Sequence, residues 1–333
     1  MCCSNFDARL NALLRWLNIE LDLDILEIKP ASSDASFRRY FRVTHAGGCH
    51  VVMDAPPDKE NILPFIRNAK LLQGAQIHVP VIYQQNLRQG FLLLEDLGCQ
   101  ALLDALQTEN ADSLYQTALD NLFKLQRDLP IDMCPWPTYD ETLLTRELGI
   151  FYEWFLEKRL GLVLPVTLRQ TLNESLIESA LQQPQVAVHR DYHSRNLMVL
   201  AEDELGVIDF QDAVIGPISY DIVSLLRDCY ISWPEQRVLG WLEHYYQRLL
   251  KAGMLNCEFV QFKRWFDLMG MQRHLKAVGI FSRLHLRDNK PGYLGDIPRT
   301  MQYILKVSQL YPEFAEFHGF LQQQVLPIYQ AHL

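Results

Sequence analysis

Short alternating stretches dominate the first hundred residues of the chain, and longer stretches with helical spacing dominate the rest. A helix is predicted over residues 6–17, where apolar residues recur every three or four positions. Two strand patterns, 39–44 and 50–54, are joined by the turn 46–48, and such a short connection predicts an antiparallel pair. The other elements predicted in this part are strands at 23–28, 79–83 and 90–95 and a helix over 64–73.

From Ala101 onward the pattern is helical and is interrupted by prolines. Helices are predicted over residues 102–106, 113–126, 141–156, 166–182, 220–230, 233–252, 258–275 and 299–310. A polar loop rich in proline and glycine is predicted over 283–299, where it could border a binding site. We therefore predict an α+β protein with two lobes, an antiparallel β small lobe over 1–98 and a mainly α-helical large lobe over 99–333.

Composition narrows the class of protein. The 333 residues are 49% hydrophobic, which is ample for two cores, and the net charge of -9 argues against a nucleic-acid-binding surface. No apolar run approaches the roughly 18 residues of a membrane span, and residues 1–11 lack the apolar core of a signal peptide. We expect a cytoplasmic protein without an obligate protein partner. The seven cysteines include no C-x-x-C pair, which favours reduced thiols over a zinc site.

The most distinctive polar residues lie in the segment 186–213. His189, Asp191 and Asn196 follow the pattern H-x-D-x-x-x-x-N, and Asp209 follows an apolar run. Phosphoryl transfer from ATP requires such residues, because the protein must place metal ions, orient the acceptor hydroxyl and accept its proton. We assign the last of these roles to Asp191. The alternative is a buried polar turn whose side chains cap backbone groups.

A β-hairpin is predicted within this segment. Apolar stretches 197–200 and 205–208 flank the polar pair 202–203. Folding about that pair would bring Asn196 and Asp209 together at the mouth of the hairpin. Amide and carboxylate oxygens are ligands that Mg²⁺ prefers, so both residues are candidate magnesium ligands.

Candidate nucleotide-binding residues lie in the small lobe. Ser33 and Ser36 belong to a small polar loop between two strands, where hydroxyl and N–H groups could hold phosphate, although an ordinary solvated turn fits equally well. No lysine occupies the strand around Met53. Arg39 is therefore a candidate phosphate ligand together with Arg38, Arg42 and Lys59, and surface solvation is the alternative for each.

The segment 91–98 passes from a buried strand into a polar stretch, as an interlobe hinge does. There the C=O of Glu95 and the N–H of Leu97 could meet the edge of an adenine. The alternative is a plain strand end. Asp221, near the start of a later helix, could cap that helix or hold the backbone of the segment around Asp191.

Together these motifs resemble the aminoglycoside phosphotransferase family, whose fold is similar to that of protein kinases. The resemblance rests on V-H-R-D-Y-H-S-R-N-L-M, G-V-I-D-F-Q-D-A and G-P-I-S-Y-D, and it covers most of the chain. It implies a two-lobed kinase-like fold, ATP and Mg²⁺ as cofactors and Asp191 as catalytic base, with Asn196 and Asp209 as metal ligands. It also implies that His193 lies near the acceptor and that His189 and Asp221 support the catalytic loop. Met53 and Gln211 depart from the family pattern.

Further motifs resemble the bacterial anomeric kinases of N-acetylmuramate and N-acetylglucosamine, among them F-L-L-L-E-D-L-G, V-S-L-L-R-D and Y-L-G-D-I-P-R. That resemblance implies an amino-sugar acceptor and a role in cell-wall recycling. Arg227 and Arg299 lie in these late motifs and are the predicted substrate ligands. The alternatives are a kinase of choline, homoserine or an aminoglycoside, and a nucleotide-binding pseudokinase that acts as an interaction module.

Overall fold

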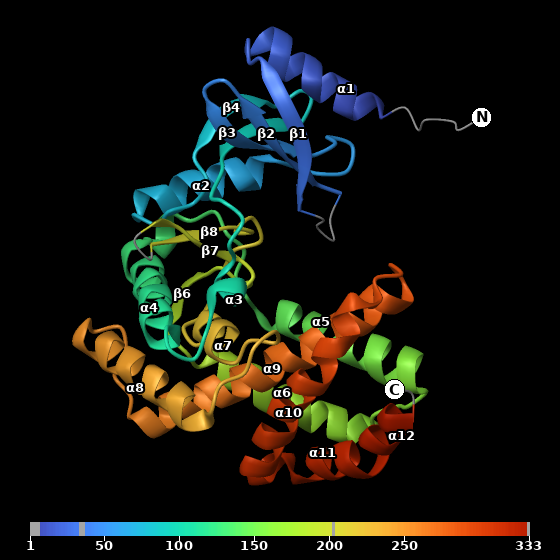
Figure 1. Ribbon diagram of the computed structural model, residues 1–333. Helices are drawn as coiled ribbons and strands as arrows, with labels where there is room; N and C mark the ends of the chain where they lie inside the picture. Colours follow the sequence, from blue (N-terminus) through green and yellow to red (C-terminus); the bar gives the residue numbers. More distant parts are fainter. Residues whose placement is uncertain (1–6, 33–36, 202–203, 332–333) are drawn as a thin grey trace. The chain divides into compact units, whose positions relative to one another are not determined.

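The computed structural model describes residues 7–32, 37–201 and 204–331 (Figure 1). The protein divides into two compact units, Met1–Gln100 with Met198–Gln211, and Ala101–Leu197 with Asp212–Leu333. The predicted division after residue 98 lies close to this one, but the hairpin segment joins the first unit. The reason is its hydrogen bonds within that unit, which run from Asn68 Nδ2 to the C=O of Phe210 (3.0 Å) and from the N–H of Val207 to the C=O of His78 (2.8 Å).

The first unit contains an antiparallel sheet, as predicted. Within the described residues its strand order is β1-β2-β3-β5-β4. Leu13, Trp16 and Leu17 pack on one face of the sheet against Val52 and other apolar side chains. The elements of this unit are α1 (Ala8–Arg15), the π-helix η1 (Trp16–Glu20), β1 (Ile25–Ser32), β2 (Arg39–His45), β3 (Gly48–Asp54), α2 (Leu63–Gly74), β4 (Ile82–Asn86) and β5 (Phe91–Glu95).

The predicted hairpin forms from β7 (Leu197–Val199) and β8 (Leu205–Val207), and its turn residues 202–203 lie outside the described residues. Gly206 in β8 faces the side chain of Leu97, because a Cβ at this position would lie 2.7 Å from Leu97 Cδ1. A side chain at position 206 would have to displace the Leu97 side chain, so the glycine allows the hairpin to pack closely against it.

Within the described residues, no helix of the protein has both the length and the apolar character needed to cross a membrane.

The second unit is mainly helical, as predicted. Its elements are α3 (Leu102–Ala105), α4 (Ala111–Asp128), η2 (Ile131–Met133), α5 (Glu141–Ile150), the π-helix η3 (Phe151–Arg159), α6 (Val166–Leu181), β6 (Gln185–Val188), β9 (Val214–Pro217), α7 (Tyr220–Leu226), α8 (Glu235–Lys251), α9 (Phe259–Leu286), η5 (Pro291–Asp296), α10 (Ile297–Leu310), η6 (Pro312–Phe314), α11 (Ala315–Phe320), the π-helix η7 (Leu321–Val325) and α12 (Leu326–Ala331).

Several element boundaries differ from the prediction. Helix α7 ends at Leu226 instead of at residue 230. Helix α9 continues to Leu286 instead of ending at Leu275, and the first part of the predicted polar loop is thus helical. Gly216 and Pro217 belong to β9, which pairs with β6 from Gln185↔Pro217 to Val188↔Val214. This small antiparallel sheet fixes the start of the segment that contains Asp191.

Helix α9 approaches the α5–η3 segment closely at Gly279. A Cβ on this residue would lie 2.6 Å from the carbonyl carbon of Ile150 and 2.7 Å from the backbone N of Phe151. Backbone atoms cannot rotate away as a flexible side chain can. The close contact of these helices therefore depends on the absence of a side chain at Gly279.

Replacing Gly279 with Ala should lower the free energy of unfolding by about 1–3 kcal/mol, because the added methyl group overpacks the contact. Gly149 provides the matched control. It is also helical, but nothing lies within 4 Å of its Cβ position. Gly149→Ala should therefore stabilise the protein by about 0.5–1 kcal/mol. Denaturant unfolding measures the stability of both variants. Equal changes in the free energy of unfolding at the two glycines would contradict the conclusion that the helix contact depends on the absence of a side chain at Gly279.

Candidate functional site

Two buried carboxylates hold the backbone of the loop that contains Asp191. Before Asp191, the carboxylate of Asp221 accepts hydrogen bonds from the N–H groups of His189 (2.7 Å) and Arg190 (3.0 Å). Arg190 has a φ of 77°, a left-handed conformation that a non-glycine residue adopts only when its surroundings enforce it. Burial raises the pKa of Asp221 to about 7, so holding this carboxylate in the interior costs free energy.

After Asp191, the loop is held by Asp228 on the segment that follows α7. Its Oδ2 accepts from the N–H of Ser194 at 2.9 Å and from the hydroxyl of the same residue, and its Oδ1 accepts from the N–H of Tyr230 at 2.9 Å. The side-chain amide of Asn196 donates to the C=O of Asp191 at 3.0 Å. The backbone is thus fixed on both sides of Asp191, which orients its side chain.

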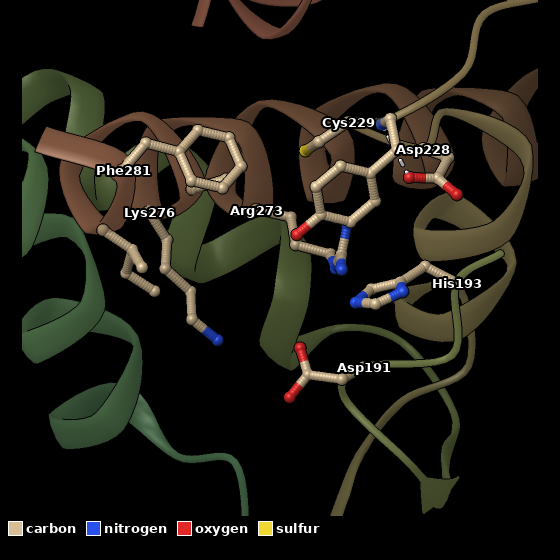
Figure 2. A pocket seen from close by; sticks show the side chains of 10 residues that line it. Asp191, His193, Asp228, Cys229, Arg273, Lys276 and Phe281 are labelled. Atoms are coloured by element: carbon tan, nitrogen blue, oxygen red, sulfur yellow. Dashed lines mark hydrogen bonds between the residues drawn. The ribbon is translucent and has the colours of Figure 1, made fainter. Parts of the chain in front are cut away.

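The side chain of Asp191 lines a pocket within the second unit (Figure 2). The pocket has an empty volume of about 490 Å³, including the solvent at its mouth. One side is apolar and aromatic, with Tyr230 and Phe281. The full lining is Asp191, His193, Asp228, Cys229, Tyr230, Arg273, Lys276, Ala277, Ile280 and Phe281.

Positive charges keep Asp191 ionised. Burial alone raises the pKa of this carboxyl, but the nearby charges, first that of Lys276 and also that of Arg273, outweigh burial and lower the pKa below its ordinary value. Burial lowers the pKa of His193, which favours its neutral ring. At neutral pH the pocket therefore presents a carboxylate acceptor beside a neutral imidazole and two cations.

A buried ion network lies next to the pocket. Glu147 on α5 accepts hydrogen bonds from Arg190 and Tyr139, and its Oε1 lies 3.0 Å from the ammonium of Lys276. Burial raises the pKa of Glu147, but the charges of Lys276 and Arg190 have a larger and opposite effect, so the pKa lies below its ordinary value. Glu147 thus links Arg190, beside Asp191, to the long helix α9.

The two predicted substrate arginines occupy different positions. Arg227 is buried, with its guanidinium 2.8 Å from Asp267 and 3.1 Å from Glu235, and this placement gives no support to a substrate contact. Arg299 is partly exposed and donates to the C=O of Cys229 at 2.9 Å. Because Cys229 lines the pocket, Arg299 braces the pocket wall.

The strand register argues against the predicted phosphate role of Arg39. Arg39 lies opposite Asp54, whereas Tyr40 lies opposite Met53, so the side chains of Arg39 and Met53 are on opposite faces of the sheet. Asp54 also binds Arg9 of α1, which identifies the face of Arg39 as the face that α1 covers. Arg39 therefore cannot replace a cation at Met53. Ser33 and Ser36 lie outside the described residues.

The segment after β5 is firmly held within the first unit. The N–H of Glu95 donates to the C=O of Val81 at 2.8 Å. The N–H of Val81 in turn donates to the carboxylate of Glu95 at 3.2 Å. The carboxylate of Asp96 accepts two hydrogen bonds from the guanidinium of Arg42, at 2.6 and 2.8 Å. The side chain of Leu97 is buried. The adenine contacts of Glu95 and Leu97 stay a prediction.

The two predicted metal ligands belong to different compact units, Asp209 to the first and Asn196 to the second. Asp209 has a φ of 66° and accepts a hydrogen bond from Gln211 Nε2 at 2.7 Å. Asn196 uses Nδ2 for the bond to Asp191, and its Oδ1 is an acceptor suited to a hard cation. The described residues include no cluster of three or more His, Cys, Asp and Glu side chains that could hold a metal ion. A magnesium site of one carboxylate, one amide and phosphate oxygens does not need such a cluster.

Sequence reasoning missed Arg273 and Lys276 as pocket residues and did not identify Asp228 as a loop anchor. The first two lie three positions apart on α9, within a run of buried residues. Charged residues inside a buried helical stretch were the available signal. That signal was lost because the helix was predicted to end at Leu275, between the two.

Residues 27–259 of the chain match the phosphotransferase enzyme family. A relative from Pseudomonas putida, named N-acetylmuramate/N-acetylglucosamine kinase, is 48% identical over 324 residues, which cover 93% of this chain and 95% of the relative.

Two solved structures share the fold at low sequence identity. The choline kinase LicA from Streptococcus pneumoniae is similar with a TM-score of 0.66 and 10% identity, covering 90% of this chain and 100% of that one. The ADP-bound aminoglycoside phosphotransferase APH(2'')-Ib is similar with a TM-score of 0.58 and 13% identity, covering 89% and 97%. The predicted kinase-like α+β fold is confirmed.

Replacing Asp221 with Ala should destabilise the protein strongly, because the buried N–H groups of His189 and Arg190 lose their acceptor. The expected loss is about 1–3 kcal/mol for each unsatisfied group. The control is Asp128→Ala, which removes a partly exposed carboxylate paired with the adjacent Arg127 and should change stability by less than about 0.5 kcal/mol. Unfolding midpoints measure both effects. A stability loss no larger for Asp221→Ala than for the control would contradict the anchoring role.

Proposed function

Because this chain belongs to the phosphotransferase enzyme family, we propose that it transfers the γ-phosphate of ATP to the anomeric hydroxyl of N-acetylmuramate or N-acetylglucosamine. The product is the sugar 1-phosphate, an intermediate suited to the recycling of cell-wall amino sugars. The observation that carries the proposal is the 48% identity, along 93% of this chain, to a relative named for both substrates. We propose the cytoplasm, where ATP is available, as the site of this activity.

In this proposal Asp191 orients the acceptor hydroxyl and takes its proton. The lowered pKa makes Asp191 a weak base, but phosphoryl transfer has a loose transition state in which the proton leaves late. Positioning of the hydroxyl by an ionised carboxylate therefore matters more than basicity. Asp221 and Asp228 supply that positioning through the loop backbone.

We assign Mg²⁺ to the oxygens of Asn196 and Asp209. When bound, the ion neutralises charge on the phosphate oxygens. Gln211 orients the carboxylate of Asp209, and the bond from Asn196 to the C=O of Asp191 ties the metal ligand to the loop that carries the base. Replacement of the usual glycine by Gln211 thus gives the carboxylate of Asp209 a further hydrogen-bond donor.

The pocket lining carries charges of both signs, with Arg273 and Lys276 as cations and Asp191 and Asp228 as carboxylates. Lys276 is paired with Glu147, whereas Arg273 offers N–H donors to a neutral or anionic group of the acceptor. Tyr230 and Phe281 offer an apolar surface for one face of a sugar ring.

The test is ATP consumption with Mg²⁺ against a panel of N-acetylmuramate, N-acetylglucosamine, choline, homoserine and kanamycin, followed by phosphorus NMR of the product. A product phosphorus coupled to an anomeric proton is expected with the two amino sugars. Turnover with choline, homoserine or kanamycin but with neither amino sugar would overturn the substrate assignment. Bound ATP without any turnover would instead favour a pseudokinase.

Replacing Asp191 with Asn should lower kcat by about 10²–10⁴-fold, because the hydroxyl loses its proton acceptor. ATP binding should be largely retained, since the charge removed lies in the acceptor pocket. Steady-state kinetics and calorimetric titration with ATP measure the two effects. A variant with near-normal kcat would exclude Asp191 as the base.

A further inference from the structure

The guanidinium of Arg273 is buried, and no carboxylate of the described residues lies within ion-pair distance of it. Its side chain projects from α9 into the pocket and is only 7% exposed. Its Nε has no hydrogen-bond partner, and in the described part of the chain its guanidinium forms no ion pair with a carboxylate. Its one specific contact is the ring of Tyr220, whose centroid lies 5.7 Å from the guanidinium carbon.

Neighbouring cations of this unit are paired. Arg190 and Lys276 share the carboxylate of Glu147, and Arg227 lies against Asp267 and Glu235. A buried guanidinium stays charged, and its N–H groups need acceptors. The Nε of Arg273 has no acceptor among the described residues, and a bound ligand can supply one.

The position of Arg273 indicates where that ligand group lies. Figure 2 shows its guanidinium pointing into the space beside Asp191 and His193, and Lys276 extends from the same helix toward the same space. Asp228 and Asp191 favour the charged form of Arg273 through space, but among the described residues neither carboxylate forms a hydrogen bond or an ion pair with its guanidinium.

We propose that Arg273 determines the preference for an acidic amino sugar by binding the carboxylate of its lactyl ether group. This rests on the proposed function, in which N-acetylmuramate and N-acetylglucosamine share a site and differ by that group. A planar guanidinium can bind a carboxylate through two parallel hydrogen bonds, which a neutral hydroxyl in the same place cannot match. Arg273 is thus a specificity residue for one of the two sugars.

The test compares both sugars on one variant. Arg273→Gln removes a charge that helps to keep Asp191 ionised, so kcat/KM should fall for both sugars, but the fall for N-acetylmuramate should be about 10- to 100-fold larger than that for N-acetylglucosamine, as loss of a charged hydrogen-bonded contact predicts. Arg273→Lys keeps the charge but loses the two parallel N–H donors of the guanidinium. It should therefore restore part of the lost kcat/KM for N-acetylmuramate. The matched control is Lys276→Met, one helical turn away, which removes the same charge but whose ammonium is bound to Glu147. It should lower activity on both sugars by the same factor.

A second measurement uses the wild-type enzyme alone, so it does not depend on the folding of a variant. The lactyl carboxylate is converted to a neutral amide, and the kcat/KM of the wild-type enzyme for this analogue should be about 10- to 100-fold lower than for N-acetylmuramate. Equal losses on both sugars in Arg273→Gln, or full activity of the wild type on the amide, would overturn the proposal. Failure of the wild type to phosphorylate either sugar would instead overturn the proposed function, so the two failures are distinguishable.

Discussion

The placement of one carboxylate among buried cations is the constraint on which the site depends. Asp191 must be ionised to accept a proton, yet it lies in a pocket where burial disfavours its charge. Lys276 and Arg273 on α9 compensate for that cost, and Glu147 in turn balances Lys276 and Arg190. The charges of the second unit thus form a connected set, in which removing one member leaves another buried charge without its partner.

Backbone anchoring complements this electrostatic arrangement. Asp221 and Asp228 come from the ends of the short helix α7, and each accepts backbone N–H groups of the loop. Side-chain anchors of this kind fix the direction of Asp191 without contact with the acceptor. Helix α7 and its flanking residues therefore serve catalysis through geometry, and the small sheet of β6 and β9 sets where the loop begins.

The sequence predicted local elements better than it predicted which face of the sheet a side chain lies on. Arg39 was grouped with Arg38, Arg42 and Lys59, and only the contact of Asp54 with both Arg39 and Arg9 of α1 revealed that Arg39 lies on the face covered by that helix. The spacing of His189, Asp191 and Asn196 is local and was readable directly. The partnership of Arg273 and Lys276 with Asp191 is not local, because it depends on how α9 packs against the loop. The anchoring role of Asp228 likewise depends on contacts with Ser194 and Tyr230 that no spacing encodes.

A crystal structure with N-acetylmuramate and a non-hydrolysable ATP analogue tests the central claim most directly. The measured quantity is the distance from the Asp191 carboxylate to the anomeric oxygen of the sugar. The account predicts hydrogen-bond contact at about 2.6–3.2 Å. An anomeric oxygen turned away from Asp191, or a different sugar hydroxyl in contact with that carboxylate, would contradict it.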